Sequence, residues 1–182
     1  MTILDEIAAY TSQRMTADEE QVSTASLRRQ ALAMASAERE TNGGASPFRF
    51  SAALAKPGLS FICEVKKASP SKGVIAEEFP YLDIAKSYEA AGAAAISCLT
   101  EPKWFMGSDA YLAEIAAETS VPVLRKDFVV CERMIYQAKA LGASAVLLIC
   151  SILSDDQLVA YRELAESLGL SVLVEAHDEK EV

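Results

Sequence analysis

Hydrophobic and polar residues follow two different patterns along the chain. In the first 58 residues apolar positions recur every three or four residues, as with Ile3, Leu4 and Ile7, and this spacing predicts helices. Farther on, short apolar runs alternate with amphipathic stretches. These runs begin 34, 28, 23 and 26 residues apart, near Phe61, Ala95, Val123, Val146 and Val172. Such spacings are typical of strand–helix units, whose strands form a parallel sheet.

Residues 1–58 are predicted to form an N-terminal helical extension. Thr16 and Glu19 have the spacing of a capping box, which predicts that a second helix begins there and ends at the glycine pair 43–44. A third short helix is expected over residues 48–55, before Pro57. The extension could be a surface cap or could face a substrate, and the pattern favours the cap.

Residues 59–182 are predicted to contain five strands and the helices between them. Gly92, Gly142 and Gly169 follow helical stretches and suit the left-handed position that ends a helix. Ser108 and Ser154 are candidate N-caps for the helices after the second and fourth strands. The segment is therefore expected to be an α/β unit with a right-handed crossover after each strand.

Ionisable residues follow the first, third and fifth apolar runs. Glu64 and Lys66 end the first run, Lys126 ends the third and Glu175 ends the fifth. If the sheet curls into a barrel, alternate strands supply inward side chains to one layer, so these groups would meet at the same mouth. Lysines and carboxylates gathered there suit acid–base chemistry, although a structural network of ion pairs remains the alternative.

Composition and net charge indicate a globular protein and argue against several kinds of partner. The 182 residues are 51% hydrophobic, enough for a sizeable core, and the net charge of −9 argues against a nucleic-acid partner, since phosphate backbones require clustered lysine and arginine. The four cysteines include no C-x-x-C pair and the sequence has one histidine, so no metal site is expected. No membrane span or leader is expected either, which favours a reducing cytoplasm.

Five stretches, taken in order, resemble the indole-3-glycerol-phosphate synthase family: Glu64-Val-Lys66-Lys-Ala-Ser69-Pro-Ser-Lys-Gly73, Ser97-Cys-Leu-Thr100-Glu101 with Phe105-Met-Gly107-Ser108, Leu124-Arg-Lys126-Asp-Phe128, Ala145-Val-Leu-Leu-Ile149 and Leu173-Val-Glu175. The resemblance implies a (β/α)8 barrel with extra N-terminal helices. It also implies conversion of 1-(2-carboxyphenylamino)-1-deoxyribulose 5-phosphate to indole-3-glycerol phosphate, CO2 and water, a step of tryptophan biosynthesis that uses no metal or organic cofactor.

The resemblance assigns catalytic roles to four residues. It implies that Lys126 is the general acid on the substrate carbonyl during ring closure and that Glu175 is an acid–base partner in the later dehydration. Lys66 would hold the carboxylate that is lost, and Glu64 would orient the lysines. How the two lysines divide the work is left open.

The resemblance assigns substrate binding to four further residues. Ser69 would help to bind the phosphate, and Phe105, Phe128 and Leu147 would form an apolar slot for the aromatic ring. Lys72, in the first loop, is equally consistent with steering an anionic substrate and with a solvated surface position. His177 is expected to face solvent or to cap a helix beginning at Asp178 rather than to act in catalysis.

The sequence also departs from the family. Residues 129–135, Ser144 and Ala176 differ from the common family residues and are expected to lie on helix surfaces or to point outward. An eight-unit barrel takes about 250 residues, so we expect the chain to be an N-terminal fragment with about five βα units, inactive alone. An open five-stranded sheet would expose an edge and its inner face, so self-association is expected.

Two other functions remain open. Lys126 could be the nucleophile of a Schiff-base barrel enzyme, because a lysine close to another cation can attack carbonyl groups. Alternatively, the partial barrel could be a non-catalytic module that binds a phosphorylated ligand or a partner chain.

Overall fold

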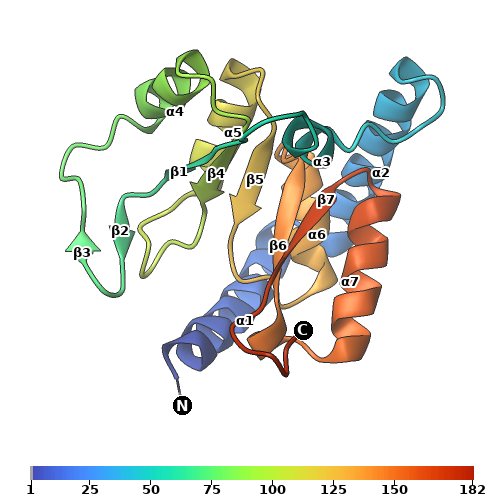
Figure 1. Ribbon diagram of the computed structural model, residues 1–182. Coiled ribbons are helices and arrows are strands. Elements are labelled where there is room, and N and C mark those ends of the chain that lie inside the picture. Colours follow the sequence, from blue (N-terminus) through green and yellow to red (C-terminus); the bar gives the residue numbers. More distant parts are fainter. Residues whose placement is uncertain (1) are drawn as a thin grey trace.

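The computed structural model describes residues 2–182 as a curved parallel sheet covered by helices (Figure 1). The elements, in chain order, are α1 (Ile3–Gln21), α2 (Thr24–Thr41), α3 (Arg49–Leu54), β1 (Ile62–Val65), β2 (Ala68–Ser69), β3 (Gly73–Val74), α4 (Tyr81–Ala90), β4 (Ala95–Leu99), α5 (Asp109–Glu118), β5 (Val123–Lys126), α6 (Glu132–Ala140), β6 (Ala145–Ile149), the 3-10 turn η1 (Cys150–Ile152), α7 (Asp155–Ser167) and β7 (Ser171–Glu175).

The main sheet is parallel throughout, with the order β1-β4-β5-β6-β7. The five strands begin within one residue of the predicted starts, which confirms the reading of the apolar runs. This architecture is a partial (β/α) barrel. In the described part of the chain β1 and β7 are the two edges of the sheet, because no strand joins them.

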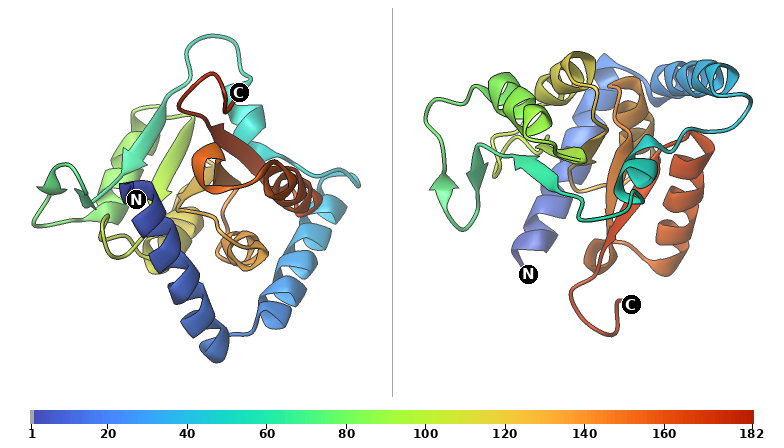
Figure 2. Two further views of the ribbon diagram at one scale, coloured as in Figure 1. Left: turned by 90° about the horizontal axis from the view of Figure 1, so that it is seen from below. Right: turned by 45° about the horizontal axis from the view of Figure 1, so that its top comes forward.

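The sheet and the N-terminal helices share one core. Strands β4 and β6 are buried along their whole length, as expected of parallel strands covered on both faces. Met15 of α1 and Leu27, Ala31 and Ala35 of α2 pack in the same cluster as the residues under the sheet. Figure 2 shows α1 and α2 diverging from their connection with α6 between them. The helical extension therefore covers the βα units rather than standing apart from them.

The predicted boundary between the first two helices was wrong. Thr16 lies inside α1, where its hydroxyl donates to the carbonyl oxygen of Ser12, four residues earlier. Helix α2 instead begins after Ser23, whose side chain accepts from the N–H of Ser26. Glu19 reaches forward to accept from the N–H of Thr24. The capping-box pattern misled because a threonine hydroxyl can be satisfied equally well inside a helix.

The predicted helix ends after the first strand are confirmed. Gly92, Gly142 and Gly169 have φ values of 88°, 87° and 75°, in the left-handed region that glycine enters without steric cost. Ser108 and Ser154 are the N-caps of α5 and α7, and their hydroxyl oxygens accept backbone N–H groups. These short-range signals could be recognised because they depend on neighbouring residues only.

Three expectations about the later segments were wrong. Val129 and residues 133–135 are all buried, and Ser144 is only 8% exposed, so these positions do not point outward, whereas Ala176 is exposed. The amphipathic α6 is covered on its outer side by α2, which the local pattern could not reveal. Residues 178–180 form a turn rather than the start of a helix, and the first loop contains a β2–β3 hairpin that the sequence did not suggest.

Among residues 2–182, no helix combines the length and the apolar character that crossing a bilayer requires.

Candidate active site

A cavity of about 290 Å³ opens at the carboxyl ends of the strands. Its charged side chains come from the ends of β1, β5 and β7. Its lining residues are Leu4, Glu64, Lys66, Leu99, Phe105, Lys126, Asp127, Phe128, Leu147, Ile149 and Glu175. This set includes every predicted site residue except Ser69. Parallel strands bring these distant positions together because all of them end at the same edge of the sheet.

Two lysine–carboxylate pairs lie in this cavity. Lys126 Nζ donates to Glu175 Oε2 at 2.9 Å, and Lys66 Nζ donates to the carboxylate of Glu64. The four side chains are between 27% and 35% exposed. Ion pairs with this much contact with water contribute only about 0–1 kcal/mol to stability. The charges therefore remain accessible to a bound molecule.

Lys126 and Glu175 pair across the strand that separates their own strands. Strand β6 lies between β5 and β7, and Glu175 is in register with Ile149 of β6. Side chains of alternate strands meet over the intervening strand when a sheet curls inward. This is the layer that the sequence pattern predicted for strands one, three and five.

An aromatic wall, which we define as Phe105, Phe128 and Leu147, forms the apolar side of the cavity. The rings of Phe105 and Phe128 lie 6.0 Å apart between centroids at an angle of 38°, and Leu147 is 2% exposed. Ring pairs at this separation attract each other. The wall is therefore a packed surface against which a planar apolar group could lie.

The helical extension contributes to the cavity in addition to covering the βα units. Leu4 of α1 lines it, and Ile7, one turn later, is buried with Phe128, Leu147 and Ile149. The spacing of these residues predicted a helix but not which elements the helix contacts. Sequence reasoning had no signal for the direction in which α1 faces, because that direction depends on where the helix docks.

Ser69 lies beside the cavity rather than in it. It belongs to β2 and lines a neighbouring space of about 460 Å³ together with Lys66, Lys72 and Phe105. Its hydroxyl oxygen accepts from the N–H of Lys72 within the β2–β3 hairpin. Lys72 and the Ser69 hydroxyl form a polar surface next to Lys66, where an anionic group could bind.

His177 lies at the rim. Its Nε2 atom is 3.1 Å from Glu175 Oε1, and its side chain is 49% exposed. Its backbone N–H donates to Glu181, which closes the turn after β7. The exposure agrees with the expected solvent-facing position, and the contact with Glu175 was not expected.

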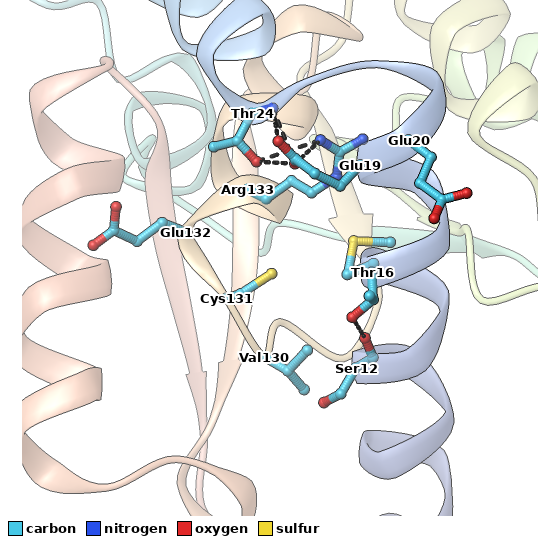
Figure 3. A pocket seen from close by; sticks show the side chains of 10 residues that line it. Ser12, Thr16, Glu19, Glu20, Thr24, Val130, Cys131, Glu132 and Arg133 are labelled. Atoms are coloured by element: carbon cyan, nitrogen blue, oxygen red, sulfur yellow. Dashed lines mark hydrogen bonds and ion pairs between the residues drawn. The ribbon is translucent and has the colours of Figure 1, made fainter.

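A larger cavity, about 730 Å³, lies elsewhere (Figure 3). It is bounded by α1, the start of α2 and residues 130–133. Its polar groups bind one another, since Glu19 accepts from Thr24 and from Arg133. This cavity contains neither of the two lysine–carboxylate pairs. Despite its size, it is therefore not the candidate active site.

Within residues 2–182, no three side chains of histidine, cysteine, aspartate or glutamate gather closely enough to hold a metal ion.

The parallel sheet with a charged mouth at its carboxyl edge places the chain in the class of (β/α)-barrel proteins. The family model of indole-3-glycerol phosphate synthase matches residues 4–182, and the chain belongs to this family. It is 52% identical over 180 residues to the indole-3-glycerol phosphate synthase of Ruminiclostridium cellulolyticum, covering 99% of this chain and 66% of that protein. It is 49% identical over 180 residues to the protein of that name from Endomicrobium trichonymphae, covering 99% and 67%. The chain thus spans about two thirds of the length of these relatives.

Proposed function

We propose that this chain carries the main catalytic groups of an indole-3-glycerol phosphate synthase. The substrate would be 1-(2-carboxyphenylamino)-1-deoxyribulose 5-phosphate, and the products would be indole-3-glycerol phosphate, CO2 and water. The observation that carries the proposal is the presence of two lysine–carboxylate pairs and an aromatic wall in one cavity. Membership of the family supports the same reaction.

The first step would be closure of the five-membered ring. The ring carbon that bears the carboxylate attacks the ketone carbon of the sugar chain, and negative charge develops on the ketone oxygen. An ammonium group stabilises this charge and donates a proton to it. Lys126 is the proposed donor, and its ion pair with Glu175 keeps the ammonium directed into the cavity.

The next steps would restore aromaticity. The carboxylate leaves as CO2, and its electron pair returns to the ring. The new hydroxyl group then leaves as water when an acid protonates it and a base removes a proton from the ring system. Glu175 is the proposed acid–base group, 2.9 Å from Lys126, with which it could exchange a proton.

The remaining contacts would hold the substrate. Lys66 would bind the carboxylate before it leaves, with Glu64 fixing the direction of its ammonium group. The aromatic wall would bind the phenyl ring, and the polar surface around Ser69 would bind part of the phosphate. The proposal includes a cytoplasmic location, where the four cysteines, which form no disulfide here, would stay reduced.

The contacts of Lys126 favour acid catalysis over a Schiff base. A nucleophilic lysine must be uncharged, and the enzymes that use one place it in an apolar pocket or next to another cation. Lys126 instead forms an ion pair with a carboxylate. Treatment with borohydride in the presence of the substrate should therefore leave no adduct on Lys126.

The test uses a fusion in which this chain is followed by the part of the Ruminiclostridium cellulolyticum protein that continues beyond the matching segment. Growth of indole fluorescence is followed with the fusion, with the 182-residue chain and with Lys126→Ala in the fusion. We expect the fusion to form product and the variant to lose this activity. A folded fusion that binds the substrate without forming product would contradict the proposal and would favour a non-catalytic binding module.

A further inference from the structure

The two rings of the aromatic wall stand on loops rather than on strands. Phe105 lies in the segment that follows β4, and Phe128 lies in the segment that follows β5. Loops vary in position more than strands do, unless hydrogen bonds hold their backbone. The position of each ring therefore depends on whatever holds its loop.

Glu101 holds the first loop from inside. Its side chain is buried, and the residue is 0% exposed. Its carboxylate accepts three backbone N–H groups: Lys103 at 2.9 Å, Trp104 at 2.7 Å and Phe105 at 3.1 Å. Burial of a carboxylate is costly unless donors surround it. Here the donors are the backbone of the loop itself, so the carboxylate and the loop fix each other.

Asp127 holds the second loop in the same way. Its side chain is 0% exposed, and its Oδ1 atom accepts the N–H of Phe128 at 2.8 Å. The Oδ2 atom accepts the hydroxyl of Thr100 at 2.7 Å, and Arg14 of α1 donates to both oxygens. The carboxylate thus joins the backbone of Phe128 to the end of β4 and to the N-terminal helix.

The two anchors are connected through one residue. Thr100, whose hydroxyl donates to Asp127, directly precedes Glu101 in the chain. The N–H of Thr100 also donates to the carbonyl oxygen of Lys126. The loop of Phe105 and the loop of Phe128 are consequently tied at their bases, next to the lysine that lies in the cavity.

We propose that Glu101 and Asp127 are positioning residues that set the aromatic wall for the phenyl ring of the substrate by anchoring the backbone at Phe105 and Phe128. This inference rests on the proposed function. Neither carboxylate needs to touch the substrate, because each acts through the N–H group of the residue whose ring does. Loss of either anchor should weaken binding of the ring more than binding of the sugar phosphate.

The experiment compares Glu101→Gln and Asp127→Asn in the fusion with two matched controls. Glu89→Gln also removes a carboxylate that accepts a backbone N–H, from Ser120. Asp109→Asn removes a carboxylate that pairs with the buried Arg125, a residue that also lies 3.5 Å from Asp127. Neither control residue lines the cavity of Lys126. Affinity is measured for the substrate and for ribulose 5-phosphate, which has the sugar phosphate but no aromatic ring.

We expect both anchor variants to raise KM for the substrate about tenfold to a hundredfold, as for lost hydrogen bonds to a charged group. Their kcat should change less than about threefold, and inhibition by ribulose 5-phosphate should be unchanged, as should every parameter of the controls. A loss of affinity for both ligands alike, or for neither, would overturn the inference. Failure of the unmodified fusion to bind or convert the substrate would instead remove the proposed function, and with it the inference.

Two further measurements test the same inference if an anchor variant folds poorly. Both hydrogen bonds from Arg14 to Asp127 start at its Nη2 atom. Arg14→Lys keeps the charge and a donor but loses the planar guanidinium, so the same pattern is expected with a smaller rise in KM. Trp104 is the single tryptophan of the sequence, and its ring packs edge-on against Tyr10 with centroids 5.4 Å apart. Its emission should shift to longer wavelength in Glu101→Gln and not in Glu89→Gln. An unchanged spectrum in a folded Glu101→Gln would show that the carboxylate does not order the loop.

Discussion

The partly exposed charged groups of the cavity and the buried charged groups next to them are held in opposite ways. Lys126 and Glu175 have side chains 27% and 32% exposed, and their ion pair reaches water. Arg125 and Asp127, the neighbours of Lys126 in sequence, have side chains 1% and 0% exposed, and both belong to a dense hydrogen-bond network. Side chains of successive strand residues point to opposite faces, so one short strand serves both regions. The reactive groups thus stay accessible while the backbone that carries them is fixed by the buried groups.

The largest expected effect is on activity, and it concerns the partly exposed pair of Lys126 and Glu175. Lys126→Met in the fusion should reduce kcat/KM by about a thousandfold or more, because a general acid that also stabilises developing charge is lost. The free energy of unfolding should change by less than about 1 kcal/mol, since the pair is partly exposed. Lys86→Met, which removes the surface pair with Glu118, is the control for a lost lysine. More than a tenth of the original activity in Lys126→Met would contradict the assigned role.

The next effect concerns stability. Asp127→Ala should lower the free energy of unfolding by about 3–5 kcal/mol, because it leaves the buried guanidinium of Arg125 and the nearly buried one of Arg14 without their shared carboxylate. Glu175→Ala, at the mouth, should lower it by about 1 kcal/mol or less. Urea titration of the 182-residue chain measures both. Equal losses for the two variants would break the contrast between the regions.

A smaller effect concerns the exposed edges of the sheet. Val174 of β7 is 52% exposed, and Phe61 and Ile62 at β1 are 59% and 40% exposed. Apolar side chains on an unpaired edge favour association with another chain. Sedimentation velocity of the 182-residue chain should show dimers or larger species that grow with concentration, and Val174→Lys should reduce them. Val159→Lys, at an equally exposed site on α7, should have no effect.

The smallest effect concerns the thiol groups. Burial raises the pKa of Cys98 from 9.0 to about 12, whereas Cys63 is only half-buried. Because the folded pKa is raised, the stabilisation from a neutral thiol is complete below pH 9 and is lost as the pH rises toward 12. At pH 9 iodoacetamide should label Cys63 and leave Cys98 unmodified in the folded chain, as read by peptide mass spectrometry. Labelling of Cys98 at the rate found in guanidinium would contradict its placement.

Much of the fold was predictable because its signals are local. The strand starts and the caps at Ser108 and Ser154 follow from residues close together in sequence, and charged residues at strand ends indicated where the cavity would form. The start of α2 was misjudged because one side-chain pattern suits both a helix start and a helix interior. The burial of residues 133–135 was missed because α6 packs against α2, which is distant in sequence.

The sequence by itself determined the order of the helices and of the strands of the main sheet, the parallel sheet and the meeting of Lys66, Lys126 and Glu175 at one edge. Periodicity and strand direction suffice for these features. Only the tertiary structure decided that Leu4 faces the cavity and that Arg14 binds Asp127, 113 positions away. A contact between distant residues depends on how a whole helix docks, and docking is set by the combined packing of many side chains rather than by any local pattern.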